Sequence, residues 1–444
     1  MDEERTALLS PTNEPDITET PMLSDEYIDS PSLDPKPKQP FLRRAYSVCV
    51  FISLGLAMMT AFNAMISLSD YWNSVYPGRH MEWKATLFFF FINPPLYLAM
   101  IFLIRLLPHI VWLAGSVAIT VLSFLLLPAI PLLLPLEIAE YACLLLILTA
   151  GAAYSVLGST VMAVSSIAGP ASVQMVMVGQ GLAGVVVIGV RIATKLVLTA
   201  GIVGHDDGVT ISAVLFFLIC SAIVSSSVPL YAALLLMDRK DRVHSEAYEP
   251  ITGEEAEEPV PASPARALSV WCHRVVAIFR QQFPANLSVC AVYLATSSCF
   301  PGMAVALLSG TPALDSTGWF AIIVLLTFMV GDQLGRLLPR IPLFRLGPWA
   351  VTSLALARLL AIPTFTVLYM LREVVIIAPL PPVLVFVFSL SNGLLSTRAF
   401  MQSSEMLPPE LTDLGGVVMT MAQVSIIFAG NMLGLLLGYI PQVK

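Results

Sequence analysis

Residues 319–340 read WFAIIVLLTFMVGDQLGRLLPR, an apolar run with Asp332 and Arg336 in its second half. Its length and apolar character predict a membrane-spanning helix. A charge at the centre of a bilayer costs at least about 2.5 kcal/mol, so charges inside spans usually serve a function. The two residues are four positions apart, which places them on one helix face, where they can pair. Two interpretations stay open: an ion pair that locks helices together, or a polar site inside the protein.

The composition of the whole chain agrees with a membrane protein. Of its 444 residues, 57% are hydrophobic and only 12% are charged, and the mean hydropathy is +0.82. A soluble domain has about 25% charged residues. These values predict an all-α polytopic membrane protein. The sequence has no basic patch interleaved with aromatic residues, so a nucleic-acid partner is not expected. The six cysteines form no C-x-x-C pair, so neither a disulfide framework nor a metal site is expected.

Apolar runs long enough to cross about 30 Å of hydrocarbon alternate with polar segments along the chain. Residues 1–40 are rich in Pro, Ser, Asp and Glu, which predicts a disordered tail. A polar linker at 237–283 divides the rest into six spans within 41–236 and five within 284–444. The eleven predicted spans are 44–69, 86–107, 110–134, 138–166, 174–200, 210–236, 285–308, 317–339, 348–371, 381–402 and 415–440.

Positively charged residues set the predicted orientation. If the N-terminus is cytosolic, the inner loops hold most of the Lys and Arg, including Arg105, Arg239, Lys240 and Arg340, and the outer loops hold few. Cytosolic loops carry an excess of Lys and Arg in membrane proteins. The sequence therefore predicts a cytosolic N-terminus and, with an odd number of spans, a C-terminus on the other side.

Other motifs favour a carrier over an enzyme. The stretch GQGLAG at 179–184 matches a dinucleotide-binding pattern, but it opens a predicted membrane span and lacks the preceding strand. Close helix packing through small residues, with Gln180 facing other helices, is the better interpretation. Arg358 lies inside the ninth span and is expected to anchor it to its neighbours. No catalytic, cofactor or metal-binding motif is present, so no enzyme activity and no cofactor is expected.

Several stretches, in order, resemble the equilibrative nucleoside transporter family. FMVGDQLGR at 328–336 is similar to the family's eighth-span pattern F-x-x-x-D-x-x-G-R, and GQGLAG opens the fifth span as it does there. The resemblance extends from about residue 41 to the end of the chain. Further similar stretches are CFPGM at 299–303, ARLLAIP at 357–363, FSLSNGLLSTRAFM at 388–401 and LPPE at 407–410.

This resemblance implies a major-facilitator-like fold of six and five helices. It also implies alternating-access transport of nucleosides, sometimes nucleobases, either facilitative or proton-coupled. Asp332 and Arg336 would bind the ribose, as a carboxylate accepts hydrogen bonds from hydroxyls and a guanidinium donates them. Phe62 and Phe300 are expected to stack on the substrate or to form walls of the cavity, and Asn63 and Gln180 to provide polar contacts. Structural or gating roles are expected for Arg358, Gly179 and Gly335.

The chain also departs from the family. Ala61-Phe62-Asn63 stands where the family has Pro-Trp-Asn. The family's fourth span carries a glutamine that reads the base, and here Gly158 stands near the matching place and no glutamine is present. Met329 replaces an asparagine before the signature aspartate. A site with fewer base-reading groups should discriminate bases less well. Two alternatives therefore stay open: a carrier of another small polar solute, or a membrane scaffold or sensor that does not transport.

The N-terminal tail contains a short motif of its own. EERTALLS at 3–10 resembles an acidic dileucine sorting signal, with Glu4 four positions before Leu8 and Leu9. Such signals bind clathrin adaptors in the cytosol. The motif favours a lysosomal, vacuolar or other endomembrane location, with the plasma membrane as the alternative.

Overall fold

The computed structural model describes residues 41–77, 79, 81–199, 205–246, 264–307, 309, 311, 319–372 and 380–438. The sorting-signal residues Glu4, Leu8 and Leu9 lie outside these ranges. In the described part every regular element is a helix.

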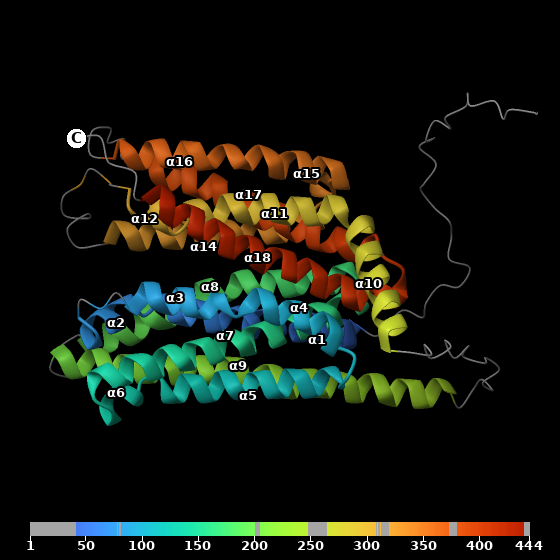
Figure 1. The fold of residues 1–444 in the computed structure, drawn as a ribbon, viewed down its shortest axis with the longest axis horizontal. Coiled ribbons are helices and arrows are strands. Elements are labelled where there is room, and N and C mark those ends of the chain that lie inside the picture. The colour runs from blue at the N-terminus through green and yellow to red at the C-terminus, as the bar shows by residue number, and fades with distance from the viewer. Residues whose placement is uncertain are drawn as a thin grey trace, which may run out of the picture. The chain divides into compact units, whose positions relative to one another are not determined.

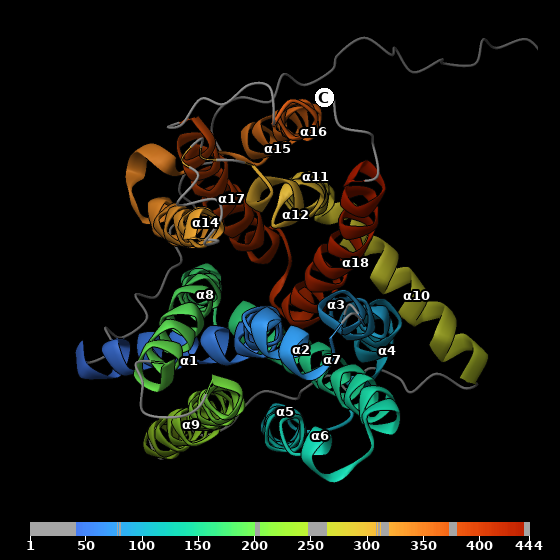
Figure 2. The same cartoon turned by 90° about the vertical axis from the view of Figure 1, so that its left-hand side faces the viewer.

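Residues 45–246 form the N-terminal half, which contains long helices and two short ones. Viewed end-on in Figure 2, its helices form one group, in blue to green. Its elements are α1 (Phe41–Ile66, which starts before the half), α2 (Ser69–Val75), α3 (Met81–Phe91), α4 (Asn93–Leu103), α5 (His109–Leu126), α6 (Ile130–Leu133), α7 (Leu136–Ile167), α8 (Pro170–Thr199) and α9 (His205–Glu246).

The C-terminal half, residues 264–438, forms the second group, in yellow to red (Figure 1). Its last helix reaches the other group and packs against α4 and α7, while α8 packs against helices of the C-terminal half. Its elements are α10 (Pro264–Gln281), α11 (Phe283–Cys299), α12 (Gly302–Val305), α14 (Trp319–Leu337), α15 (Pro348–Ala357), the 3-10 turn η3 (Arg358–Leu360), α16 (Ala361–Met370), α17 (Leu380–Glu405) and α18 (Thr412–Gly438).

Prolines explain why several predicted spans are divided. Proline removes a backbone donor and clashes with the preceding turn. The second predicted span is accordingly made of α3 and α4, with Pro94 and Pro95 in the first turn of α4. The first turn of α6 likewise contains Pro131.

Ten helical segments in the described residues are long and apolar enough to cross a membrane. The 19-residue α14 is not among the ten, although it coincides with the predicted eighth span and carries Asp332 and Arg336. The protein is therefore a multi-pass membrane protein. The total of eleven spans and the cytosolic N-terminus stay predictions.

The predicted polar linker at 237–283 contains more helix than its composition suggested. Helix α9 continues to Glu246, and α10 occupies residues Pro264–Gln281. Figure 1 shows α10 lying across the long helices. Ile278 is buried, and Val275 and Phe279 pack against residues of α4 and α18. Apolar residues at helical spacing specify this amphipathic helix. The average composition of residues 237–283 is polar, so it does not reveal that spacing.

Small residues let helices approach closely at two places that matter for the site. A Cβ atom at Gly393 of α17 would overlap the backbone oxygen of Asp332, and one at Gly335 of α14 would overlap the oxygen of Leu390. A Cβ atom at Gly179 of α8 would likewise overlap the backbone oxygen of Ile52 on α1. The backbones of α14 and α17 are thus in direct contact beside Asp332 and Arg336.

Candidate functional site

The pair predicted from the sequence forms on α14. Arg336 Nε donates to Asp332 Oδ2 at 2.7 Å, one helical turn apart. Asp332 is 6% exposed and Arg336 is 5% exposed. Since a buried charge is costly without a partner, the pair explains how α14 accommodates both side chains.

Arg336 also reaches across to the N-terminal half. Its Nη1 donates to the backbone oxygen of Met177 at 2.9 Å and approaches Gln180 Oε1 at 3.5 Å, both on α8. In return, Gln174 Nε2 donates to the backbone oxygen of Arg336 at 3.2 Å. The ion pair therefore lies at the interface between the two halves, and Gln180 lies beside it.

A chain of hydrogen bonds fixes the other oxygen of the carboxylate. Asn392 Nδ2 on α17 donates to Asp332 Oδ1 at 2.7 Å. The amide oxygen of Asn392 accepts from Thr296 Oγ1 at 2.6 Å, and Thr296 Oγ1 accepts from Arg358 Nη2 at 2.9 Å. Because a carboxylate can only accept, the amide nitrogen of Asn392 faces Asp332 and its amide oxygen faces Thr296. The single hydroxyl hydrogen of Thr296 is shared between that oxygen and the Val292 backbone oxygen, 2.8 Å away.

Arg358 stands at the far end of this chain. Its Nη1 donates to the backbone oxygen of Phe388 at 2.6 Å and bonds Ser391, and its guanidinium lies 4.3 Å from the centre of the Phe388 ring. Arg358 therefore joins the turn after α15 to both α11 and α17. Asp332, Arg336 and Arg358 together carry one negative and two positive formal charges. Such a cluster favours a ligand rich in hydrogen-bond acceptors over a cation.

The N-terminal half contributes an aromatic group to the same interface. Phe62 lies 4.9 Å from Phe90 and 5.8 Å from Phe89, measured between ring centres. Phe89 contacts Tyr154 at 5.4 Å, and Tyr154 contacts Tyr97 edge-on at 6.4 Å.

Tyr293 of α11 brings the C-terminal half into contact with this aromatic group. Tyr154 and Tyr293 belong to one cluster of buried residues, and Phe62 packs against the same cluster. The cluster therefore includes aromatic side chains from both halves.

The remaining predicted residues lie farther from the pair. Asn63 is buried on α1, and its backbone oxygen accepts from the amide of Ser67. Phe300 stacks on Phe328 with ring centres 3.7 Å apart. That contact belongs to a hydrophobic cluster of the C-terminal half, separate from the cluster against which Phe62 packs. The structure therefore does not bring Phe62 and Phe300 together.

Sequence reasoning did not assign Asn392 or Thr296 to the site. Asn392 belongs to the Ser-Asn-Gly stretch of the tenth predicted span, and that polar residue inside an apolar run was the available signal.

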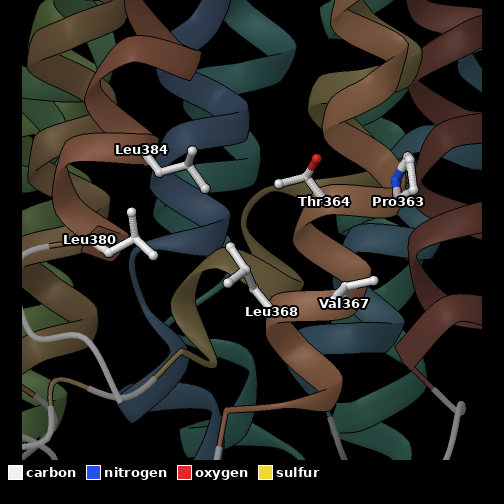
Figure 3. Close-up of a pocket in the computed structure, with 6 residues that line it drawn as sticks. All are labelled: Pro363, Thr364, Val367, Leu368, Leu380 and Leu384. Atoms are coloured by element: carbon white, nitrogen blue, oxygen red, sulfur yellow. The ribbon is translucent and has the colours of Figure 1, made fainter. Parts of the chain in front are cut away.

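A pocket of about 500 Å³ lies between α16 and α17, away from this cluster (Figure 3). It is lined by Pro363, Thr364, Val367, Leu368, Leu380 and Leu384. With a single hydroxyl among its lining side chains, it offers a polar solute few partners. The candidate site is therefore the buried polar cluster at the interface of the halves.

Known proteins resemble this chain in sequence. A family model described as nucleoside transporter matches residues 144–440, a range that contains the whole polar cluster. The chain belongs to the nucleoside transporter family. Nucleoside transporter 2 of Leishmania donovani is 30% identical over 131 residues, which are 30% of this chain. The matched part spans 24% of that relative's length.

Solved structures of two transporters are similar to this chain over most of its length. A bacterial homologue of the iron transporter ferroportin, in an outward-facing state, covers 88% of this chain and 92% of its own, with 13% identity and a TM-score of 0.52. The Major Facilitator Superfamily transporter FucP, in the outward conformation, covers 87% of this chain and 98% of its own, with 12% identity and a TM-score of 0.47. The first likeness confirms the predicted all-α transporter fold.

Proposed function

We propose that this protein carries nucleosides, and nucleobases as further substrates, across a membrane by alternating access. The observation that supports it most is the buried Asp332–Arg336 pair, which lies at the interface of the two halves and contacts both. A polar cluster in that position is reached from either side when two halves rock about it. Membership of the nucleoside transporter family agrees with the proposal.

The chemistry of the cluster suits a nucleoside. The Asp332 oxygens, each already holding one donor, have further lone pairs for two sugar hydroxyls. Arg336 can donate to the ring oxygen or to a hydroxyl, and its flat guanidinium keeps the carboxylate neutralised. The aromatic group of Phe62, Phe89 and Tyr154 would border the base. In this proposal the sugar lies on the C-terminal half and the base faces the N-terminal half.

A second ion pair supports alternating access. Arg105, just after α4, donates from Nε to Asp413 Oδ2 at 2.7 Å and from Nη2 to Asp413 Oδ1 at 2.6 Å. Asp413 begins α18 in the other half. Nearby, Arg340 contacts Met175 Sδ at 3.0 Å across the same interface. These contacts join the halves at the end predicted to be cytosolic, and the proposed carrier must release them to open inward.

Exchange of the Arg105 and Asp413 charges tests this role. Arg105→Glu and Asp413→Arg alone are expected to slow transport, because like charges then meet at the closed end. The double variant restores the pair and should recover about fivefold in initial rate, the equivalent of about 1 kcal/mol of coupling for a partly exposed pair. Radiolabelled uptake into proteoliposomes measures all four proteins. A double variant no faster than either single variant would exclude a gating role for this pair.

Uptake by the purified protein tests the proposed function directly. Liposomes that contain only this protein would be given labelled adenosine or uridine at about pH 5.5 and about pH 7.5. Saturable uptake of either compound supports a nucleoside carrier, and faster uptake at the acidic pH supports proton coupling. No uptake of either by folded protein would overturn the proposal, and uptake of other labelled small polar solutes would then separate a different carrier from a scaffold.

The location of the proposed carrier depends on the tail. Glu4, Leu8 and Leu9 fit an adaptor-binding dileucine signal, so we expect an endomembrane location. Replacement of both leucines by alanine should move the protein to the plasma membrane, as measured by surface biotinylation. Thr6→Ala is the matched control within the same segment. If the double variant stays inside the cell in the same proportion as the wild type, the motif does not sort this protein.

A further inference from the structure

Tyr97 has an unusual environment on α4. Its side chain is fully buried, and its hydroxyl lies near the Tyr154 side chain but makes no hydrogen bond of normal length and angle to any residue in the described part of the chain. Buried polar groups in proteins are nearly always hydrogen-bonded, so an unpaired one requires an explanation.

The hydroxyl occupies a space that Gly158 of α7 leaves open. A Cβ atom at position 158 would overlap Tyr97 Oη and would lie 2.9 Å from the Cε of Met58 on α1. Three helices of the N-terminal half therefore meet at this point. Any side chain at 158 would displace the tyrosine hydroxyl, which stands in its place.

The position of Tyr97 relates it to the ion pair. Its hydroxyl and Met58 Cε both border Gly158, and Met58 Sδ accepts a hydrogen bond from Gln180 Nε2 at 3.1 Å. Gln180 Oε1 in turn lies 3.5 Å from Arg336 Nη1. Tyr97 and Gln180 belong to the N-terminal half, whereas Asp332 and Arg336 belong to the C-terminal half, so these contacts connect Tyr97 to the ion pair across the interface.

We propose that the Tyr97 hydroxyl, placed by Gly158, is the hydrogen-bonding group that reads the base of the bound nucleoside. This inference rests on the proposed function. A phenol donates one hydrogen bond and accepts others, and each nucleobase edge offers both donors and acceptors. A ligand that supplies the missing partner explains the unpaired hydroxyl. The positions of those donors and acceptors differ between bases, so a fixed hydroxyl favours the base whose polar group lies opposite it.

Tyr97→Phe removes only the hydroxyl and tests the proposal. We expect the KM for the preferred nucleoside to rise about tenfold and the ratio of KM values between the best and worst nucleosides to fall by a similar factor. The melting temperature without ligand should stay the same or rise, since an unpaired buried group is removed. Uptake of adenosine, guanosine, uridine and cytidine, with melting measured in parallel, gives all these values. Tyr46→Phe is the matched control, because the Tyr46 hydroxyl bonds the Leu230 backbone oxygen.

Gly158→Ala provides an independent second variant. Its Cβ should push the Tyr97 hydroxyl aside and lower base discrimination in the wild-type background. In the Tyr97→Phe background it should have little further effect, because the atom with the severest overlap is gone and the end of the flexible Met58 side chain can move aside. Additive losses in the double variant would show that Gly158 does not act through Tyr97 and would overturn that part of the proposal.

The outcomes separate this inference from the proposed function. If wild-type protein takes up no nucleoside, the proposed function fails and this inference fails with it. If wild-type protein transports nucleosides but Tyr97→Phe changes neither KM nor base preference, only this inference is overturned. The same holds if wild-type protein has equal KM values for all four nucleosides. A lowered melting temperature with unchanged base preference would assign Tyr97 a structural role instead.

Discussion

Asp332→Ala is expected to reduce nucleoside uptake by about 100-fold or more. Asp332 is proposed to hold two sugar hydroxyls, and a hydrogen bond to a charged group contributes about 1.5–3 kcal/mol. The loss of two such bonds exceeds 2.7 kcal/mol, which corresponds to a hundredfold loss of affinity. Initial rates in proteoliposomes, normalised to the amount of reconstituted protein, measure the effect. Glu405→Gln is the control, because Glu405 also pairs with an arginine, Arg398, but its side chain is exposed.

A double variant separates binding from a structural ion pair. Removal of Asp332 alone leaves Arg336 buried without its partner, which can cost about 3–5 kcal/mol of folding stability. Asp332→Ala combined with Arg336→Met removes both charges and should recover folded protein. If the pair binds substrate, this double variant stays inactive although it is folded. Recovery of both folding and transport would show that the pair serves only to hold the helices.

Gly393→Ala is expected to be among the most disruptive single substitutions. Its new Cβ would overlap the backbone oxygen of Asp332 and lie 2.8 Å from the amide nitrogen of Arg336. Backbone atoms cannot move aside as a side-chain end can, so α14 and α17 must separate. Overpacking of this kind costs about 3 kcal/mol. Melting followed by size-exclusion chromatography should show a clear loss of stability, and uptake should fall because Asp332 and Arg336 shift with α14.

The control for this prediction is Gly189→Ala on α8. Position 189 is also inside a long helix, but a Cβ there meets no atom within 4 Å. Alanine favours a helix over glycine by about 1 kcal/mol, so this variant should be as stable as the wild type or more so. Equal melting temperatures for the two variants would contradict close packing between α14 and α17.

Local and compositional features of the sequence determined much of this description. Long apolar runs indicated membrane spans. A single span in a bilayer satisfies its backbone groups only as a helix, so the runs predicted an all-α membrane protein. Asp332 and Arg336 are one turn apart, so their pairing follows from helix geometry without knowledge of the fold. Ordered motifs such as the FMVGDQLGR stretch also predicted the family, which the match over residues 144–440 confirms.

Contacts between distant residues were decided only by the tertiary structure. Arg105 and Asp413 are 308 positions apart, and Thr296, Arg358 and Asn392 meet from three separate elements. The place of Tyr97 depends on how closely α4 and α7 approach at Gly158. Helical periodicity specifies which face of a helix is apolar, but it does not specify which helix covers that face or at what distance. Packing between helices decides it, and it also forms the chain of hydrogen bonds behind Asp332 and places the Tyr97 hydroxyl against Gly158.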